Sequence, residues 1–329
     1  MIRTIVIMHP GGFGDLLLAV PAIRSLRSRF SQHQFLLCGH DEVSEFIYEC
    51  RLVDRWISVQ ASACTALFGG VEPNDLLLKD WLSRCDLAVA WTRDESGRLA
   101  AALKNSGAAA VLVQSPFCLS LAALHQSDRF LEILHEPASE DGAIEPFSVP
   151  VHLRERGSTC LDACDLSSNR PLVLIHPGSG SKHKCVDPAM LASVLQLLQA
   201  QGIVPLILEG PADQESVARL LSHLSMKPTV LRGLSLCLLA GVFSRIELFI
   251  GHDSGVSHLS ALLGTPTVAL FGPTNPTRWA PRGPHVTIMQ GEPCGCLSWD
   301  EVSRCAKKPC LRISPQAILG ACKVQELST

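Results

Sequence analysis

The feature that most constrains the fold of this chain is an alternation of short apolar runs with helix-like segments, which occurs in both halves of the sequence. Apolar strands that alternate with helices are typical of a parallel sheet covered by helices on both faces. In the first half, strands are expected at 3–9, 34–38, 56–59, 87–91 and 110–113, and helices at 16–29, 43–50, 76–83, 98–105 and 119–135. In the second half, strands are expected at 172–176, 204–209 and 229–231, helices at 188–201, 212–224 and 236–243, and a strand, helix and strand within 249–276. We therefore predict an α/β protein with two doubly wound Rossmann-like domains that face a central cleft.

The alternation lapses between Glu136 and Pro150, in a polar passage bracketed by prolines that is typical of a linker. A length of 329 residues also fits two domains better than a single core. We predict domains at residues 1–150 and 151–329. A last helix, at about 314–323, begins at Ser314-Pro315, a side-chain cap followed by proline. This C-terminal helix is able to pack back on the first domain.

Composition narrows the functional classes. Hydrophobic residues make up 47% of the chain and charged residues 18%, which favours a well-buried globular protein. The net charge is -3 and the 28 Lys and Arg form no dense basic run, so we expect no nucleic-acid partner. We find no signal-peptide pattern and no apolar run of roughly 18 to 20 residues, and expect a cytoplasmic protein. In that compartment the 14 Cys are expected to be free thiols.

The first glycine-rich turn, Gly11-Gly12-Phe13-Gly14-Asp15, follows the first strand directly. It is a weak dinucleotide fingerprint, because Leu17 stands where the third glycine belongs. A carboxylate at such a strand-to-helix turn can accept a proton from a substrate hydroxyl, so Asp15 is a candidate general base. A helix-capping role explains Asp15 equally well.

The second turn runs from His176 to Lys184 and again follows a strand. Its small residues allow backbone amides to approach an anion, Ser179 and Ser181 add hydroxyl donors, and Lys184 or Lys182 adds positive charge. The ending of a Walker loop is missing. We favour contact with a phosphate over a merely flexible loop.

The stretch 249–276 supplies a helix start with small and polar residues before it. Backbone amides there, beside Asp253, Ser254, Gly255 and His258, suit a phosphate-bearing ligand. A core histidine remains an alternative for His258. Asp213 follows the strand at 204–209, where an acid often meets sugar hydroxyls, although a first-turn helix acid is an equal explanation.

Four late cysteines are spaced Cys-x-Cys-x8-Cys-x4-Cys, at 294, 296, 305 and 310. The spacing lacks the paired knuckles of common structural zinc sites. We therefore favour reduced thiols over a metal at Cys294, Cys296, Cys305 and Cys310, and expect no metal in the protein.

Four motifs together make the chain resemble the heptosyltransferases of glycosyltransferase family 9, from about residue 1 to 323. They are Gly14-Asp15-Leu16-Leu17-Leu18-Ala19-Val20-Pro21-Ala22, His176-Pro177-Gly178-Ser179 through Lys184, Gly210-Pro211-Ala212-Asp213, and Gly251 to His258 with Phe271-Gly272-Pro273-Thr274. The segment from Cys310 to Pro315 is similar to the family's closing segment. The resemblance implies the glycosyltransferase B fold, with an acceptor-binding N-terminal domain and a nucleotide-sugar-binding C-terminal domain.

The resemblance also implies an inverting, metal-independent transfer, usually from ADP-L-glycero-D-manno-heptose, to the lipopolysaccharide core or a similar glycan. Asp15 then matches the general base and Lys184 a lysine near the diphosphate. Ser179 and Ser181 lie in the phosphate loop, and Asp213 matches an acidic donor-site position. Asp253, Ser254, Gly255 and His258 match the donor-binding motif.

Two departures leave alternatives open. The family commonly has Asn or His and then Trp-Pro after the lysine, where this chain has Cys185-Val186-Asp187-Pro188. The first half also has a single Tyr and no basic cluster for a phosphorylated acceptor. A nucleotide-sugar 2-epimerase-like enzyme and a non-catalytic nucleotide-sugar-binding paralogue are the alternatives. The expected partners are a nucleotide-sugar donor and a glycolipid or oligosaccharide acceptor, bound by a monomer that contacts the inner face of the cytoplasmic membrane transiently.

Overall fold

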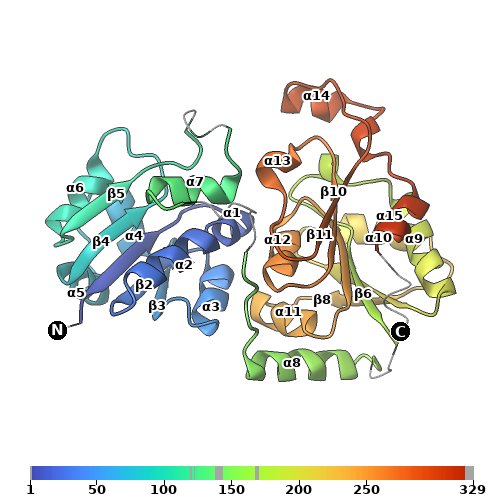
Figure 1. Cartoon of the computed structure of the whole chain (residues 1–329), viewed down its shortest axis with the longest axis horizontal. Helices are drawn as coiled ribbons and strands as arrows, with labels where there is room; N and C mark the ends of the chain where they lie inside the picture. The colour runs from blue at the N-terminus through green and yellow to red at the C-terminus, as the bar shows by residue number, and fades with distance from the viewer. Residues whose placement is uncertain (1, 119–120, 122, 138–143, 167–169, 323–329) are drawn as a thin grey trace. The chain divides into compact units, whose positions relative to one another are not determined.

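The computed structural model describes residues 2–118, 121, 123–137, 144–166 and 170–322. The chain divides into two compact units, residues 1–140 and 141–329. The division lies within residues 138–143, outside the described residues, in the proline-bracketed passage that the sequence marks as a linker. Each unit contains one parallel sheet with helices on both faces, which confirms the predicted α/β fold (Figure 1).

The described part of the first unit holds a parallel sheet of strand order β3-β2-β1-β4-β5. Its strands are β1 Thr4–Met8, β2 Gln34–Gly39, β3 Arg55–Ser58, β4 Cys85–Ala90 and β5 Ala110–Val113. Its helices are α1 Phe13–Leu18, α2 Val20–Arg29, α3 Asp41–Glu49, α4 Ser62–Phe68, α5 Leu76–Ser83, α6 Arg98–Asn105 and α7 Gln126–Ile133. Helices α4, α5 and α6 share one apolar core with β1 and β4, whereas α2 packs against α7. The sheet is therefore doubly wound.

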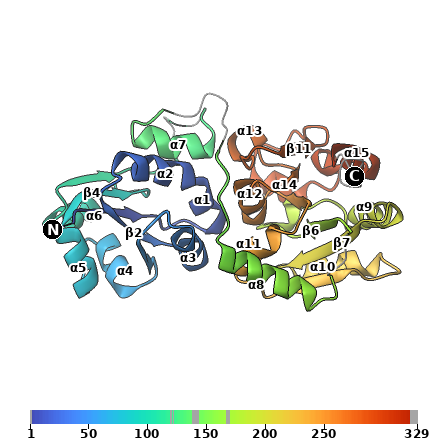
Figure 2. The same cartoon turned by 60° about the horizontal axis from the view of Figure 1, so that its bottom comes forward.

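The second unit has a parallel sheet of strand order β11-β10-β9-β6-β7-β8 in its described part. Its strands are β6 Leu172–His176, β7 Val204–Glu209, β8 Thr229–Arg232, β9 Leu248–His252, β10 Thr267–Phe271 and β11 Val286–Gln290. Its helices are α8 Val151–Asp162, η2 Lys182–Lys184, α9 Pro188–Ala200, α10 Gln214–Ser222, α11 Leu236–Phe243, α12 Gly255–Leu262, α13 Pro276–Trp279, α14 Trp299–Arg304, η3 Pro309–Leu311 and α15 Pro315–Ala321. Helices α9, α10 and α15 lie on one side of the sheet and α8, α11 and α12 on the other (Figures 1 and 2).

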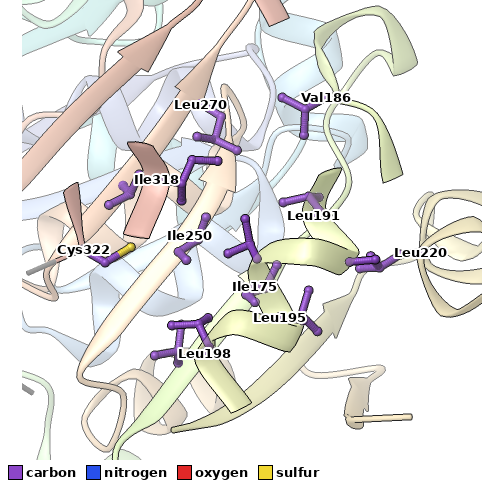
Figure 3. Packing of buried hydrophobic residues seen from close by; sticks show 14 of the residues in the cluster. Ile175, Val186, Leu191, Leu195, Leu198, Leu220, Ile250, Leu270, Ile318 and Cys322 are labelled. Carbon is purple, nitrogen blue, oxygen red and sulfur yellow. The ribbon is translucent and has the colours of Figure 1, made fainter. Parts of the chain in front are cut away.

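The core of the second unit explains why its strands read as unbroken apolar runs. β6, β9 and β10 are buried along their whole length, because helices cover both of their faces. On the α9 side, Ile175, Leu195 and Ile250 pack with Ile318 of α15 and with Cys322 (Figure 3). Helix α15 thus packs against α9 of its own unit. Packing of this helix on the first domain stays a prediction.

Several predicted elements differ from the structure in their bounds. The helix predicted at 16–29 begins at Phe13 and divides at Ala19, beside Pro21, which lacks an N–H for a helical hydrogen bond. The helix predicted at 119–135 begins only at Gln126 in the described residues, where the His125 ring accepts a hydrogen bond from the Ser127 amide. The sequence pattern did not predict α4, α8, β11 and α14.

All 14 Cys are free thiols, as predicted for the chain. Among the helices that the structure describes, none has both the length and the apolar character that crossing a bilayer requires.

Helices α8 and α11 approach each other closely at two glycines, Gly157 and Gly241. A Cβ added to Gly157 would lie 2.1 Å from the backbone carbon of Gly241, and one added to Gly241 would lie 2.0 Å from the Leu153 carbonyl oxygen. The two backbones therefore touch, and neither position has room for a side chain.

We expect Gly157→Ala to lower the free energy of unfolding by about 1–3 kcal/mol, because the added methyl forces α8 and α11 apart. The matched control is Gly320→Ala in α15, where an added Cβ meets nothing within 4 Å. Alanine favours a helix over glycine, so this control should gain about 0.5–1 kcal/mol. Urea unfolding of both variants tests the contact, and equal stability of the two variants would contradict it.

Candidate functional site

The candidate site lies at the carboxyl ends of β6, β7 and β9, which are adjacent or nearly adjacent in the second sheet. Parallel strands bring their carboxyl ends to one edge, and the register pairs His176 with Gly251 there. Each of these strands ends in a polar residue: His176 for β6, Glu209 for β7 and His252 for β9. The loops that follow, together with the start of helix α12, carry every site residue predicted in the second half of the chain.

The Asp213 carboxylate ties the end of β6 to the loop after β7. Its Oδ2 lies 2.8 Å from His176 Nε2 and accepts a hydrogen bond from the Gly210 amide at 2.9 Å. Asp213 is only 6% exposed. Burial by itself would raise the pKa of Asp213, but the hydrogen bonds from His176 and Gly210 outweigh it and hold the pKa below its usual value. The carboxylate is therefore ionised and engaged within the protein.

Two glycines make room for that carboxylate. A Cβ added to Gly178 would lie 1.7 Å from Asp213 Oδ1, and one added to Gly210 would lie 2.7 Å from Oδ2. No side chain larger than hydrogen fits beside Asp213 at these two points without moving it.

The second cluster joins the loop after β6 to the loop after β9. Lys184 Nζ donates to Asp253 Oδ2 at 2.8 Å, and Ser179 Oγ donates to the Asp253 carbonyl at 2.6 Å. The Asp253 side chain is 8% exposed, whereas that of Lys184 is 21% exposed. The pair thus places a partly accessible ammonium group beside a buried carboxylate. The ring of Trp299 in α14 lies 5.9 Å from the same Nζ.

Helix α12 begins beside this pair. Its N-cap residue, Ser254, makes no side-chain cap hydrogen bond. Ser254 Oγ instead lies 3.4 Å from His176 Nδ1 and 3.4 Å from Ser257 Oγ. Gly255 is the first helical residue, and the first amides of an α-helix have no partner within the helix. Such amides suit the oxygens of an anion.

Two buried histidines of the site, His252 and His258, are neutral. Burial lowers the pKa of His258 to about 4, against a weaker opposing effect of Asp253. Burial also lowers the pKa of His252 to about 4. His252 Nε2 accepts a hydrogen bond from the Val186 amide at 3.1 Å, and Nδ1 lies 3.2 Å from the Gly178 carbonyl. The neutral tautomer with a proton on Nδ1 satisfies both contacts.

The predicted residues of the second half do not all have the same role. Lys184, Asp253, Ser254, Gly255 and His258 gather around the start of α12. Ser181 caps the short helix η2, where its Oγ accepts a hydrogen bond from the His183 amide at 3.3 Å. Asp213 organises the backbone of the two loops that it joins.

Asp15 belongs to the first unit. It is a half-buried acid in the first turn of α1, and Gly12 rather than Asp15 is the N-cap of that helix. The turn before it is tightly packed, since a Cβ added to Gly11 would lie 2.5 Å from the His9 ring. The helix-capping interpretation of Asp15 is therefore wrong, although an acid in the first turn is favourable to the helix dipole. The assignment of Asp15 as a general base stays a prediction.

The sequence pattern did not mark His176, His252 and Trp299 as members of the site. The first two carried a usable signal, because a histidine that ends an apolar parallel strand lies at the edge where ligands bind. Trp299 carried none, since no spacing links it to Lys184. Among the described residues no group of three or more His, Cys, Asp or Glu is arranged to hold a metal ion, and this includes the four late cysteines.

We expect Gly178→Ala to displace Asp213 and lower the free energy of unfolding by about 1–3 kcal/mol, because the methyl overlaps the carboxylate. Gly180→Ala in the same loop is the control, since an added Cβ there meets nothing within 4 Å. Urea unfolding measures both. A Gly178→Ala protein as stable as the control would show that the close approach of Asp213 to this glycine is not needed.

We expect the free energy of unfolding to fall as the pH drops from about 6.5 toward 4. His9, His252 and His258 have folded pKa values of about 4 against an ordinary value of 6.5, so only the unfolded chain takes up protons in this window. Each histidine contributes on the order of 3 kcal/mol to the free energy of unfolding. This contribution is fully present above pH 6.5 and is lost as the pH falls to 4. Urea unfolding at several pH values measures the slope. Replacing His252 with Gln should make the fall of stability with pH less steep, whereas His223→Gln at an exposed position should not.

Comparison with known proteins shows which family this chain belongs to. Residues 124–307 match the sequence profile of "Glycosyltransferase family 9 (heptosyltransferase)". A lipooligosaccharide heptosyltransferase 2 of Campylobacter jejuni is 24% identical over 288 residues, which cover 83% of this chain and 82% of that protein. A lipopolysaccharide heptosyltransferase 3 of Escherichia coli is 32% identical over 113 residues, and this match spans only 33% of each chain.

Solved structures show the same fold. A family 9 glycosyl transferase of Veillonella parvula superposes with a TM-score of 0.81 at 20% identity, covering 99% of this chain and 98% of the other. An ADP-heptose lipopolysaccharide heptosyltransferase II of Escherichia coli gives 0.75 at 18% identity, covering 98% and 99%.

Proposed function

Because this chain belongs to glycosyltransferase family 9 and is a glycosyltransferase, we propose that it transfers a heptose from an ADP-sugar to a glycan of the lipopolysaccharide core. The names of its relatives support this substrate class, since they include lipopolysaccharide and lipooligosaccharide heptosyltransferases. The structural relative from Escherichia coli is itself named for ADP-heptose. The observation that carries the proposal is the group formed by Lys184, Asp253 and the start of α12.

The donor diphosphate is proposed to bind at the start of α12. The Gly255 amide lies in the first turn of α12, where free helical amides and the helix dipole favour negative charge. The Lys184 ammonium group lies at the same place, held by Asp253 at 2.8 Å. A diphosphate oxygen can share this ammonium group, which retains two further donors.

Three of the predicted donor-site residues act in this proposal by holding others in place. Ser179 holds the Asp253 backbone, Ser181 caps the turn that carries Lys184, and Asp213 fixes His176. Ser254 and His258 border the diphosphate position. With His258 neutral, its ring can donate or accept a hydrogen bond without adding charge.

The reaction proposed is a direct displacement with inversion. Asp15 takes the proton of the acceptor hydroxyl, whose oxygen forms a bond to the anomeric carbon. The bond from that carbon to the diphosphate oxygen breaks, and ADP leaves with the electron pair. The α12 amides and Lys184 stabilise the charge that develops on the leaving diphosphate. The first unit is proposed to bind the acceptor and the second the donor, and no metal is needed in this scheme.

The proposal predicts separable effects of Asp15 and Lys184. Asp15→Asn should reduce transfer by about 10²–10⁴-fold while donor affinity stays close to that of the wild type, because a lost general base affects the chemical step. Lys184→Met should weaken donor binding by about tenfold or more, because a charge-assisted contact is lost. The assay follows ADP release from ADP-heptose with a heptose-deficient lipopolysaccharide acceptor, and calorimetry measures donor affinity.

Lys227→Met, at an exposed lysine far along the chain from these motifs, is the control for both measurements. UDP- and GDP-sugars serve as control donors. Turnover by Asp15→Asn at the wild-type rate would contradict the assignment of Asp15 as the general base. Equal affinity for all of the nucleotide sugars would contradict the ADP-heptose assignment. Release of the sugar in the absence of an acceptor would show that the enzyme hydrolyses its donor instead of transferring the sugar.

A further inference from the structure

The second unit contains a pocket whose walls carry an excess of positive charge. Its volume is about 400 Å³, within the range of small-molecule sites, and it lies between the start of α9, helix α10 and residues 306–312. Its basic lining residues are Lys182, Arg219, Lys307, Lys308 and Arg312. One lining residue, Asp187, is acidic.

Most of this charge is not neutralised by ion pairs in the part of the chain that the structure describes. Over the residues that the structure describes, no ion pair is found for Lys182, Lys307, Lys308 or Arg312. Arg219 pairs with Glu215 at 2.8 Å, but these side chains are 63% and 73% exposed, so water screens the pair. Concave surfaces lined by charge of one sign concentrate counter-ions. The pocket is thus suited to an anion.

The pocket is distinct from the group around α12. Lys182 and Lys184 are the two ends of the short helix η2, yet Lys184 binds Asp253 whereas Lys182 lines the pocket. None of Asp253, Ser254 and His258 contributes to its lining. Lys184 therefore belongs to the candidate site at α12, and Lys182 belongs to the pocket.

The floor of the pocket is apolar. Val186, Leu191 and Leu220 line it and also belong to the buried core of the unit, where Figure 3 labels them. A cationic rim over an apolar floor fits a molecule with a charged group and a less polar body.

We propose that this pocket binds a small organic phosphate, with the phosphate held by Lys307, Lys308 and Arg312 and the body resting on Val186, Leu191 and Leu220. Arginine presents paired N–H donors to phosphate, and lysine adds a mobile point charge. The pocket is built from residues of the second unit alone, so the inference does not depend on the donor or acceptor assigned above.

Inorganic pyrophosphate is the probe for calorimetry, in a Lys184→Met background that weakens the proposed donor site. Pyrophosphate should still bind this protein. Adding the charge reversals Lys307→Glu and Arg312→Glu should weaken binding at least about tenfold, as expected for lost charge-assisted hydrogen bonds. The matched control adds Lys79→Glu and Lys104→Glu, two exposed lysines of the first unit with the same change in net charge.

Absence of pyrophosphate binding in the Lys184→Met protein would overturn the proposal. So would an equal loss in the pocket variant and its control, since that result reflects net charge alone. Failure of the donor proposal is seen separately, as an unchanged affinity of Lys184→Met for ADP-heptose.

A second arm separates soluble from lipid-borne phosphate. Vesicles of phosphatidylcholine with and without phosphatidic acid are sedimented with the pocket variant and its control. Loss of sedimentation with the acidic vesicles in the pocket variant alone assigns the phosphate to a lipid headgroup. Equal sedimentation of both variants, together with their different pyrophosphate affinities, assigns it to a soluble molecule.

Discussion

The contact on which the candidate site depends is the buried hydrogen bond between Asp213 and His176. An ionised carboxylate in such a place is costly unless its oxygens are hydrogen-bonded. Here the His176 ring and the Gly210 amide meet that need, and the bare backbones of Gly178 and Gly210 allow the approach. The consequence is that the loops after β6 and β7 leave the sheet along fixed paths. The loop after β6, held in this way, places Lys184 within hydrogen-bond distance of Asp253.

Much of the fold was readable from the sequence, because a doubly wound sheet imposes a simple pattern. Strands buried on both faces give apolar runs such as 172–176, and these were located nearly to the residue. Elements with weaker patterns were missed. β11 has no buried residue, and one of the three buried residues of α8 is a glycine, so the apolar pattern of both segments is weak. Helix α7 begins after His125, whose ring caps the helix, and helix propensities do not predict a histidine cap.

The site was readable in part. Charged and small residues after strands marked the loops of Lys184 and Asp253 correctly as neighbours at one sheet edge. Their individual contacts were not readable, since an acid after a strand can face a ligand or, as Asp213 does, a neighbouring His176. Nor does a sequence show that two lysines of one turn, Lys182 and Lys184, diverge. The place of Asp15 relative to these groups is likewise a matter of domain arrangement, which local pattern does not encode.

The neutral state of His258 has a consequence for how the site would respond to a charged ligand. Its ring is uncharged because burial lowers its pKa, although Asp253 works in the opposite direction. An anion at the start of α12 would add to the effect of Asp253 and raise the affinity of the ring for a proton. The Lys184 ammonium group opposes this effect, because it lowers the pKa of His258. The buried ring can thus stay neutral beside a bound anion, and the positive charge of the site is left to Lys184 and the helix start.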